Sequence, residues 1–381
     1  MHVCHLITGL GPGGTPVMLR NVLASLRTRG LTFSVINMTH IGPAAEQLEW
    51  MGIEVHHLRL SPGVPDPRGL WRVTKLLRAL KPDVLQTWLY HADLLGALAG
   101  PLCGRPPLIW NLRHATLQPG VDSRSTLLAA RACARLSRSA PRLILANSRT
   151  GLQTHVDAGY DGARMRLIPN GFDTTRFRPD PLARAEIRGE LGVGEQTPLI
   201  GLAARYSRLK GSDIFIRAMQ RLSQSRPDAR FVMCGDNIHS DNAPLRAALR
   251  ESASDRFLLL GERTDMPRVQ AALDIAVSAS VSEAFSNSLG EALACGVPVV
   301  TTDAGDSADL VGEAGFVVPI NDADALADAC FDLLQRPAEH RRRLGERGRQ
   351  RIERLYSIDA AAEQYLSVWR EVGGAAARAA A

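Results

Sequence analysis

Short apolar runs and segments with helical periodicity alternate along almost the whole chain. They form two series, which a segment rich in Pro, Arg and Glu separates at about residues 174–195. Strands that alternate with helix-length segments are typical of parallel sheets with helices on both faces, and ligands bind such sheets at the carboxyl ends of the strands. The main strands that the pattern predicts are residues 3–8, 33–38, 53–58, 84–87 and 143–147 in the first series, and 198–203, 230–234, 257–260, 275–278, 297–301 and 315–319 in the second.

The most informative stretch is residues 282–301, which predicts a loop, a short helix at about 287–294 and then an apolar strand. The first amides of a helix have no intrahelical acceptor, so they and the helix dipole form a site for an anion such as a phosphate. Glu283 and Glu291 lie at either end of this turn, where each can accept hydrogen bonds from vicinal hydroxyls. The arrangement suits a sugar nucleotide, although two such glutamates can also simply face solvent. The first-turn helix amides that could bind the phosphate are those of Asn287, Ser288 and Leu289.

The loop after strand 198–203 carries two cations, Arg205 and Lys210. Two cations in a strand-to-helix loop can hold a diphosphate. The loop is not a Walker loop, because the chain contains no G-x-x-x-x-G-K-[ST] sequence. Asp322 and Asp324 form a D-x-D pair, but they precede a helical segment and are better interpreted as its N-cap and first-turn acids than as metal ligands.

Near the N-terminus, Gly9, Gly11 and Gly14 match the G-x-G-x-x-G fingerprint between a predicted strand and a predicted helix. A nicotinamide dinucleotide would also need a carboxylate at the end of strand 33–38, where residues 37–40 supply none. The simpler interpretation is a turn in which Gly13 and Gly14 present their amides to a ligand at a helix start.

Two histidines follow strands of the first series: His91 comes after strand 84–87, and His114 ends the segment 109–114, which contains the next predicted strand. Either could be an ordinary hydrogen-bonded structural residue, but both lie at the carboxyl ends of predicted parallel strands. Arg113 lies beside His114 and makes it the better candidate for handling an anion. No pattern of carboxylates or cysteines near either histidine indicates a metal.

The formal net charge of +6 is concentrated in residues 1–180, which carry 21 Lys and Arg against 11 Asp and Glu. Aromatic residues make up 5% and no nucleic-acid-reading motif is present, so an anionic membrane surface or lipid phosphate fits this half better than nucleic acid. The segment 123–142 predicts a basic helix that could lie on such a membrane or merely face solvent, with its last four arginines opposite Leu127 and Leu128. Its arginines are Arg124, Arg131, Arg135, Arg138 and Arg142.

Two further features bear on the cellular location. The six cysteines are scattered without CxxC spacing, which indicates reduced thiols and no zinc site. No apolar run is long enough to span a bilayer, and the N-terminus lacks the basic region of a signal peptide. We therefore expect a cytoplasmic protein, with peripheral contact at the inner face of the cytoplasmic membrane as a further option.

Taken in order, these motifs resemble those of the retaining glycosyltransferases of family 4, which have the GT-B fold: two Rossmann-like domains that face each other across a cleft. The resemblance covers about residues 1–370 and is closest to bacterial enzymes that build lipopolysaccharide or exopolysaccharide. It rests on the Glu283-x7-Glu291 signature with the Cys-Gly-Val-Pro-Val-Val that follows, the Arg205/Lys210 loop, the turn at residues 168–173 and the N-terminal glycine loop.

The resemblance implies roles for individual residues. Arg205 and Lys210 would bind the donor diphosphate, Glu283 the hydroxyls of the donor sugar and Glu291 the ribose, while the amides of residues 287–289 would lie near the phosphate and sugar. Gly13 and Gly14 would contact the phosphate from the facing domain, and closure of the domains would bring His114 beside the reacting sugar. Arg113 would lie next to that site, and Arg263, in the segment 261–264, would flank the base.

The function implied is transfer of a hexosyl group from a nucleotide diphosphate sugar to a hydroxyl of a lipid-linked or oligosaccharide acceptor, with retention at the anomeric carbon and without a metal or other cofactor. Two alternatives remain at this point: an NAD(P)-dependent oxidoreductase and a non-catalytic sugar-nucleotide-binding protein. The expected domains are residues 1–175 and 176–355, followed by a helix at 356–372 that packs back toward the first domain and a disordered tail at 373–381.

Overall fold

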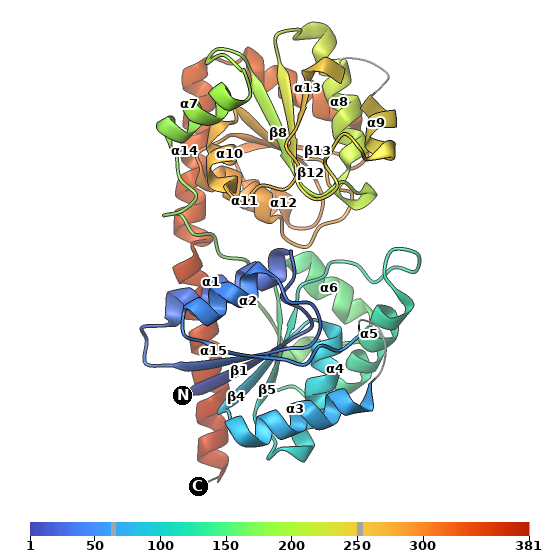
Figure 1. The fold of residues 1–381 in the computed structure, drawn as a ribbon, viewed down its shortest axis with the longest axis vertical. Coiled ribbons are helices and arrows are strands. Elements are labelled where there is room, and N and C mark those ends of the chain that lie inside the picture. Colours follow the sequence, from blue (N-terminus) through green and yellow to red (C-terminus); the bar gives the residue numbers. More distant parts are fainter. Residues whose placement is uncertain (62–65, 250–253, 381) are drawn as a thin grey trace. The chain divides into compact units, whose positions relative to one another are not determined.

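The computed structural model describes residues 1–61, 66–249 and 254–380, and the chain divides into two compact units (Figure 1). Unit 1 comprises Met1–Gly171 and Ile358–Ala381, and unit 2 comprises Phe172–Ser357. The chain crosses between them at two adjacent points: the amide of Phe172 donates to the carbonyl oxygen of Tyr356 at 2.8 Å. The boundaries therefore lie a few residues from those predicted, 175/176 and 355/356.

Unit 1 is built on a parallel sheet of seven strands in the order β3-β2-β1-β4-β5-β6-β7. The buried strands are nearly all apolar, as expected for a parallel sheet covered on both faces. The strands are β1 (His2–Ile7), β2 (Thr32–Asn37), β3 (Glu54–His57), β4 (Val84–Trp88), β5 (Leu108–Leu112), β6 (Leu143–Ala146) and β7 (Met165–Leu167).

Two apolar cores, one on each face, attach the helices of unit 1 to this sheet. One core joins α1, α2 and α15, with Trp369 of α15 fully buried, and the other joins α3, α4 and α5. The helices are α1 (Gly14–Leu26), α2 (Pro43–Trp50), α3 (Pro67–Leu80), α4 (Tyr90–Ala99), α5 (Arg124–Leu136), α6 (Arg149–Asp157) and α15 (Ile358–Ala380), with short 3-10 turns η1 (Gly100–Leu102) and η2 (Gly162–Arg164).

Unit 2 repeats the design with a parallel sheet of six strands in the order β10-β9-β8-β11-β12-β13. These are β8 (Leu199–Ala203), β9 (Arg230–Cys234), β10 (Phe257–Leu259), β11 (Ile275–Ser278), β12 (Val299–Thr302) and β13 (Gly315–Val318). Its helices are α7 (Pro181–Glu190), α8 (Ser212–Ser225), α9 (Ala243–Leu249), α10 (Met266–Ala272), α11 (Asn287–Ala294), α12 (Ser307–Val311), α13 (Ala323–Gln335) and α14 (Ala338–Leu355), with 3-10 turns η3 (Arg208–Lys210) and η4 (Ser254–Arg256).

Both sheets have a point where the strand order reverses, because successive crossovers run first to one side and then to the other. In unit 1 it lies between the neighbouring strands β1 and β4, and in unit 2 between β8 and β11. The loops that leave such a pair diverge to opposite faces of the sheet and open a crevice, which is where open α/β sheets bind ligands. The strand order alone therefore predicts that ligands bind at the loops after β8 and β11 in unit 2 and at the loops after β1 and β4 in unit 1.

Helix α5 differs from the prediction. It ends at Leu136, so Arg138 and Arg142 lie beyond it and the four later arginines do not share one helical face. Leu128 is 63% exposed and stands on the arginine side, whereas the buried face consists of Ala129, Ala130, Cys133 and Ala134. The small residues are buried because α5 packs against α4, and side chains of this size allow two helices to approach closely.

The C-terminal segment also differs from the prediction, because α15 continues to Ala380 where a disordered tail from residue 373 was expected. Alanine is the strongest helix former, so an Ala-rich sequence extends a helix that tertiary contacts have already nucleated. All six cysteines are unpaired. Within the described residues, none of the helices is both long and apolar enough to cross a membrane.

Candidate functional site

The predicted donor residues of unit 2 gather at its strand-order reversal. Arg205 and Lys210 lie in the loop that follows β8, and Glu283 lies in the loop that follows β11. The amide of Val281 donates to the carbonyl oxygen of Leu209 at 2.9 Å, which ties the two loops together. The sequence alone could not bring these loops together, because their contact depends on β8 pairing with β11.

Gly211 makes the close approach of the two loops possible. Its φ is 64°, in the left-handed region, and a Cβ atom there would lie 1.8 Å from the carbonyl oxygen of Ala279. Only glycine fits this position. It completes the 3-10 turn η3, in which the side chain of Ser207 accepts a hydrogen bond from the amide of Lys210.

An ion pair joins Lys210 and Glu283 at the centre of this site. The Nζ of Lys210 contacts Oε2 of Glu283, which also lies 3.4 Å from the hydroxyl of Ser280. The Lys210 side chain is 29% exposed and that of Glu283 is 13% exposed, so the pair is partly desolvated and its mutual attraction exceeds that of a surface pair. One carboxylate oxygen of Glu283 is thus already engaged, which disfavours it as a nucleophile. Arg205 is exposed and makes no ion pair within the described part of the chain.

Helix α11 begins at Asn287 and ends at Ala294, as the sequence predicts. Its N-cap residue, Ser286, has extended backbone angles but makes no side-chain hydrogen bond to the first turn. The side chain of Leu289 is buried, so only its backbone can contribute to an anion site, whereas Ser288 and Glu291 are partly exposed. The helix start thus lies four residues after Glu283, in the position that a phosphate site requires.

Two residues for which the sequence predicted no contact with the segment 282–301 support it. Phe172 packs against Gly290 of α11, where a Cβ atom would lie 2.0 Å from the ring's Cζ, and the same ring stacks on Phe285 with centroids 6.2 Å apart. Gly305, after β12, lies beneath Glu283: its φ is 61° and a Cβ atom would lie 2.0 Å from the Glu283 carbonyl oxygen. A glycine just after a predicted strand was the only signal for Gly305.

Arg263 lies in the loop after β10 and is held by two carboxylates. Its guanidinium contacts Asp265 at 2.8 Å and Glu190 at 2.5 Å, and these hydrogen bonds raise the pKa of Arg263 above its usual value. The loops after β9 and β10 are joined by a hydrogen bond from the amide of Gly235 to the carbonyl oxygen of Gly261 at 2.8 Å. The structure therefore fixes Arg263 locally, and its role beside the base stays a prediction.

In unit 1, the glycine loop leads from β1 into α1. Gly13 is the N-cap residue, with a φ of 148°, and Gly14 is the first residue of the helix. Both are exposed, so their backbones are accessible to a ligand. The last residue of β2, Asn37, is buried and donates to the carbonyl oxygen of His40 at 2.9 Å. No carboxylate occupies the position that a dinucleotide ribose would need, and the oxidoreductase alternative is not favoured.

His114, after β5, is oriented by a carboxylate that the sequence did not indicate. Its Nε2 lies 2.7 Å from Oδ1 of Asp122, whose other oxygen accepts from the amide of Gln118 at 3.0 Å. The ring also packs edge-on against Tyr90, with centroids 6.1 Å apart. The His114 side chain is 37% exposed, so this histidine is both positioned and accessible.

Arg113 turns away from its neighbour. Its guanidinium lies over the ring of Trp88 at 5.6 Å and donates to Oδ1 of Asn170 at 2.5 Å, on the side of the sheet covered by α15. Burial lowers the pKa of Arg113, and its Nη1 is buried without a hydrogen-bond partner among the described residues. The structure therefore does not bring Arg113 and His114 to one surface, and a substrate-binding role for Arg113 stays a prediction.

No group of three or more His, Cys, Asp or Glu side chains is arranged to hold a metal ion within residues 1–61, 66–249 and 254–380. The Asp322–Asp324 pair behaves as predicted from sequence: the side chain of Asp322 accepts from the amide of Ala325 at 2.8 Å and caps α13.

Comparison with known proteins gives the same class for both units. Residues 12–176 match the family described as Glycosyltransferase Family 4, and residues 197–336 match Glycosyl transferases group 1. A phosphatidylinositol monomannoside mannosyltransferase of Mycolicibacterium smegmatis, described as GDP-mannose-dependent and alpha-(1-6), is 30% identical over 72% of this chain and 73% of its own. The chain belongs to glycosyltransferase family 4 and has the GT-B fold.

Two further comparisons set the range of similarity. A lipopolysaccharide core biosynthesis mannosyltransferase, LpsB of Rhizobium meliloti, is 32% identical over 45% of this chain and 51% of its own, so the match spans about half of that relative. The crystal structure of Anabaena Alr3699/HepE in complex with UDP and glucose superposes with a TM-score of 0.84, 24% identity, and 96% and 98% coverage of the two chains. At that identity the superposition establishes the fold alone.

Proposed function

We propose that the protein is a retaining glycosyltransferase that moves a hexosyl group from a nucleotide diphosphate sugar to a hydroxyl of a lipid-linked or oligosaccharide acceptor in the synthesis of a cell-surface glycan. The observation that carries the proposal is the Lys210–Glu283 ion pair, which lies at the strand-order reversal of unit 2, four residues before the start of α11. A cation, a carboxylate and a helix N-terminus thus lie within one loop cluster, and this supports the proposal because groups of these three kinds can bind the phosphates and hydroxyls of a sugar nucleotide.

In the proposed reaction the donor diphosphate contacts Arg205, Lys210 and the first amides of α11. As the bond between the anomeric carbon and the diphosphate breaks, negative charge develops on the departing oxygen, and these fixed positive groups stabilise it. Cations and helix amides supply this field, so the proposal requires no metal. Glu283 accepts hydrogen bonds from the sugar hydroxyls and Glu291 from the ribose.

Retention follows if the acceptor attacks from the face that the diphosphate leaves. The acceptor oxygen bonds to the anomeric carbon, and the proton of its hydroxyl passes to the departing phosphate oxygen, so no covalent enzyme intermediate is needed. Glu283 is the candidate carboxylate nucleophile, but Lys210 and Ser280 both contact its Oε2, which disfavours that role. The role of His114 beside the reacting sugar remains a prediction, supported by its fixed contact with Asp122.

The relatives guide the choice of donor and acceptor. The Mycolicibacterium smegmatis relative is named as GDP-mannose-dependent and acts on a phosphatidylinositol monomannoside, and the Rhizobium meliloti relative is named for lipopolysaccharide core biosynthesis. The HepE structure contains UDP and glucose. A donor panel therefore needs both GDP- and UDP-sugars, and peripheral contact with the inner face of the cytoplasmic membrane belongs to the same proposal.

The experiment incubates the purified protein with each of GDP-mannose, UDP-glucose, UDP-galactose and UDP-N-acetylglucosamine, and measures nucleoside diphosphate release. One preferred donor with slow hydrolysis, accelerated by an acceptor and unaffected by EDTA, is the expected result. Binding of a donor without release of nucleoside diphosphate in any acceptor mixture would contradict catalysis, and loss of all activity on chelation, restored by Mg²⁺, would contradict the metal-free mechanism.

A further inference from the structure

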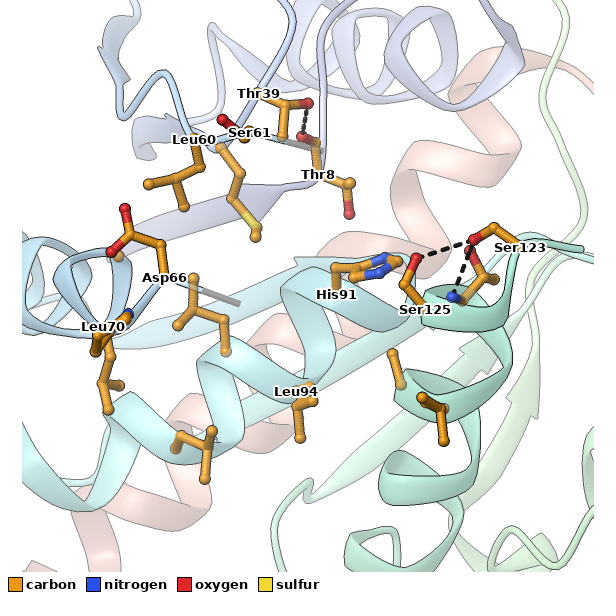
Figure 2. Close-up of a pocket in the computed structure, with 18 residues that line it drawn as sticks. Thr8, Thr39, Leu60, Ser61, Asp66, Leu70, His91, Leu94, Ser123 and Ser125 are labelled. Atoms are coloured by element: carbon orange, nitrogen blue, oxygen red, sulfur yellow. Dashed lines mark hydrogen bonds between the residues drawn. The ribbon is translucent and has the colours of Figure 1, made fainter. Parts of the chain in front are cut away.

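Unit 1 contains a pocket of about 920 Å³ at the carboxyl ends of β1 and β2, lined by the first halves of α3 and α5 and by most of the length of α4 (Figure 2). Its volume is in the range of pockets that enclose organic ligands of several hundred daltons. It lies near the strand-order reversal of unit 1, where Thr8 follows β1 and His91 is the second residue of α4. Its position thus meets the general rule for ligand crevices in parallel sheets.

The walls of the pocket are chiefly leucine side chains from three helices: Leu70 of α3, Leu94 and Leu98 of α4 and Leu128 of α5. Leu98 is 48% exposed and Leu128 63% exposed, so apolar surface extends from the pocket to solvent. Contiguous exposed apolar surface on a protein marks a place where a partner or ligand binds. A chain of methylene groups matches such walls, whereas a sugar would leave its hydroxyls without partners.

Apart from that of the exposed Ser61, the hydroxyl groups that line the pocket are already engaged by the protein. Thr39 donates to the carbonyl oxygen of Thr8 at 2.5 Å, and the Ser123 hydroxyl accepts from the amide of Thr126 at 3.1 Å as the N-cap of α5. These polar groups therefore add little capacity to bind a polyhydroxylated ligand. Among the buried polar atoms of the described lining residues, the exception is Nε2 of His91, which has no hydrogen-bond partner.

The α5 end of the pocket is basic. On the exposed side of α5, Leu128 is flanked by Arg124 four residues before it and Arg131 three residues after it. Both arginines are exposed and make no ion pair among the described residues. Asp66, the acidic residue in the lining, lies at the α3 end, where its side chain accepts from the amide of Arg68 as an N-cap (Figure 2). An anionic group is therefore attracted to the α5 end.

This basic end is also the end nearest to His114. Ser123, in the pocket lining, directly follows Asp122, which holds His114. Tyr90, which packs against the His114 ring, directly precedes His91. Burial lowers the pKa of His91, so its ring is neutral and can donate or accept one hydrogen bond at the polar end of the pocket.

We propose that this pocket binds the aliphatic chain of a lipid acceptor whose phosphate group lies at the α5 end, against Arg124 and Arg131. Since this assigns an acceptor class, it rests on the proposed function, but it makes a binding claim that is independent of turnover. The chain lies along Leu94, Leu98 and Leu128, and His91 gives a hydrogen bond to a head-group oxygen.

The test measures binding of butyl, hexyl, octyl and decyl phosphate to the full-length protein by calorimetry, below their critical micelle concentrations. Each methylene that enters the pocket should tighten binding about three- to fourfold, until the pocket is filled. A Kd that does not change with chain length would overturn the proposal.

Two variants separate the chain from the head group. Leu98→Gln/Leu128→Gln removes apolar surface at partly exposed positions without adding charge, and should weaken decyl phosphate about tenfold and reduce the gain per methylene. Leu102→Gln is the matched control, because Leu102 is 49% exposed on the same unit but does not line the pocket. Arg124→Gln/Arg131→Gln should weaken every alkyl phosphate by a similar factor of about five and leave the gain per methylene unchanged. Equal losses in the leucine variant and its control would contradict the proposal.

The experiments distinguish failure of the lipid-pocket proposal from failure of the proposed glycosyltransferase reaction. Chain-length-dependent binding without donor turnover would leave the lipid pocket standing and reject the glycosyltransferase reaction. Donor turnover with a water-soluble sugar acceptor, unaffected by Leu98→Gln/Leu128→Gln and without chain-length-dependent binding, would confirm the reaction and reject the lipid pocket.

Discussion

Replacing Lys210 by alanine should have two separable effects, one on stability and one on turnover. The substitution leaves Glu283, only 13% exposed, with the Ser280 hydroxyl as the remaining side-chain contact of its carboxylate among the described residues, so a partly buried carboxylate loses its counter-ion. Removing one partner of such a pair costs about 1–2 kcal/mol once solvent screening is taken into account. For a domain of this size that lowers Tm by roughly 2–8 °C.

The effect on turnover should be larger. A fixed cation that contacts the departing diphosphate resembles one donor of an oxyanion site, whose removal lowers kcat about 10²- to 10³-fold. The double variant Lys210→Met/Glu283→Gln removes both charges, so it should recover most of the lost stability while turnover stays low. Lys75→Ala, at an exposed lysine of α3 in unit 1, is the matched control and should behave as wild type.

The assay pairs thermal unfolding with the rate of nucleoside diphosphate release for each variant at saturating acceptor. Recovery of turnover together with stability in the double variant would contradict a direct role of Lys210 in turnover, because the defect of Lys210→Ala would then be one of folding. Turnover of Lys210→Ala within about threefold of wild type would refute the assignment of Lys210 to the diphosphate.

Three further predictions concern the supports of the site and the core. Gly290→Ala places a methyl group against the ring of Phe172 and should lower the unfolding free energy by about 1–3 kcal/mol. Adding Phe172→Leu to this variant should restore part of that loss, and urea unfolding measures both effects. Additive losses in the double variant would contradict the direct clash. Asp122→Asn removes the charge that orients His114 and should lower kcat about tenfold while the KM for the donor stays unchanged; a change in KM alone would argue against a role in turnover. Burial lowers the pKa of His5 from 6.5 to about 3, so the stability that the neutral ring contributes is complete above pH 6.5 and is lost as the pH falls, by about 1.4 kcal/mol per pH unit. His5→Gln should therefore reduce the pH dependence of the unfolding free energy by the equivalent of one proton. Identical pH dependence of the two proteins in urea unfolding between pH 6.5 and 4.5 would contradict this role of His5.

Local features of the sequence were sufficient to predict helix α11. Its start at Asn287 and end at Ala294 follow from a loop, a helix-forming segment and a Gly and Pro stop within a few residues of each other. The βα alternation likewise gave the two parallel sheets, because buried parallel strands are continuous apolar runs. The short helix α9 (Ala243–Leu249) was not predicted, since seven residues carry little periodic signal.

The contacts that make the site could not be predicted from the sequence. Lys210 and Glu283 are 73 positions apart and meet only because β11 pairs with β8 rather than with its sequence neighbour β10. The partnership of His114 with Asp122 depends on a loop with little regular structure, so its geometry leaves no pattern in the sequence. Helix α5 was assigned the wrong face because small residues, not its leucines, contact the neighbouring helix.

The proposed activity is sugar transfer from a nucleotide donor with retention at the Lys210–Glu283 site. It is tested most directly by ¹H NMR of the first product formed from the preferred donor and a decyl phosphate-linked sugar acceptor, followed in time before any anomeric equilibration. We predict a glycoside with the same anomeric configuration as the donor, formed in step with nucleoside diphosphate release and lost in Lys210→Ala. An inverted product, or an unchanged rate in that variant, would contradict the claim.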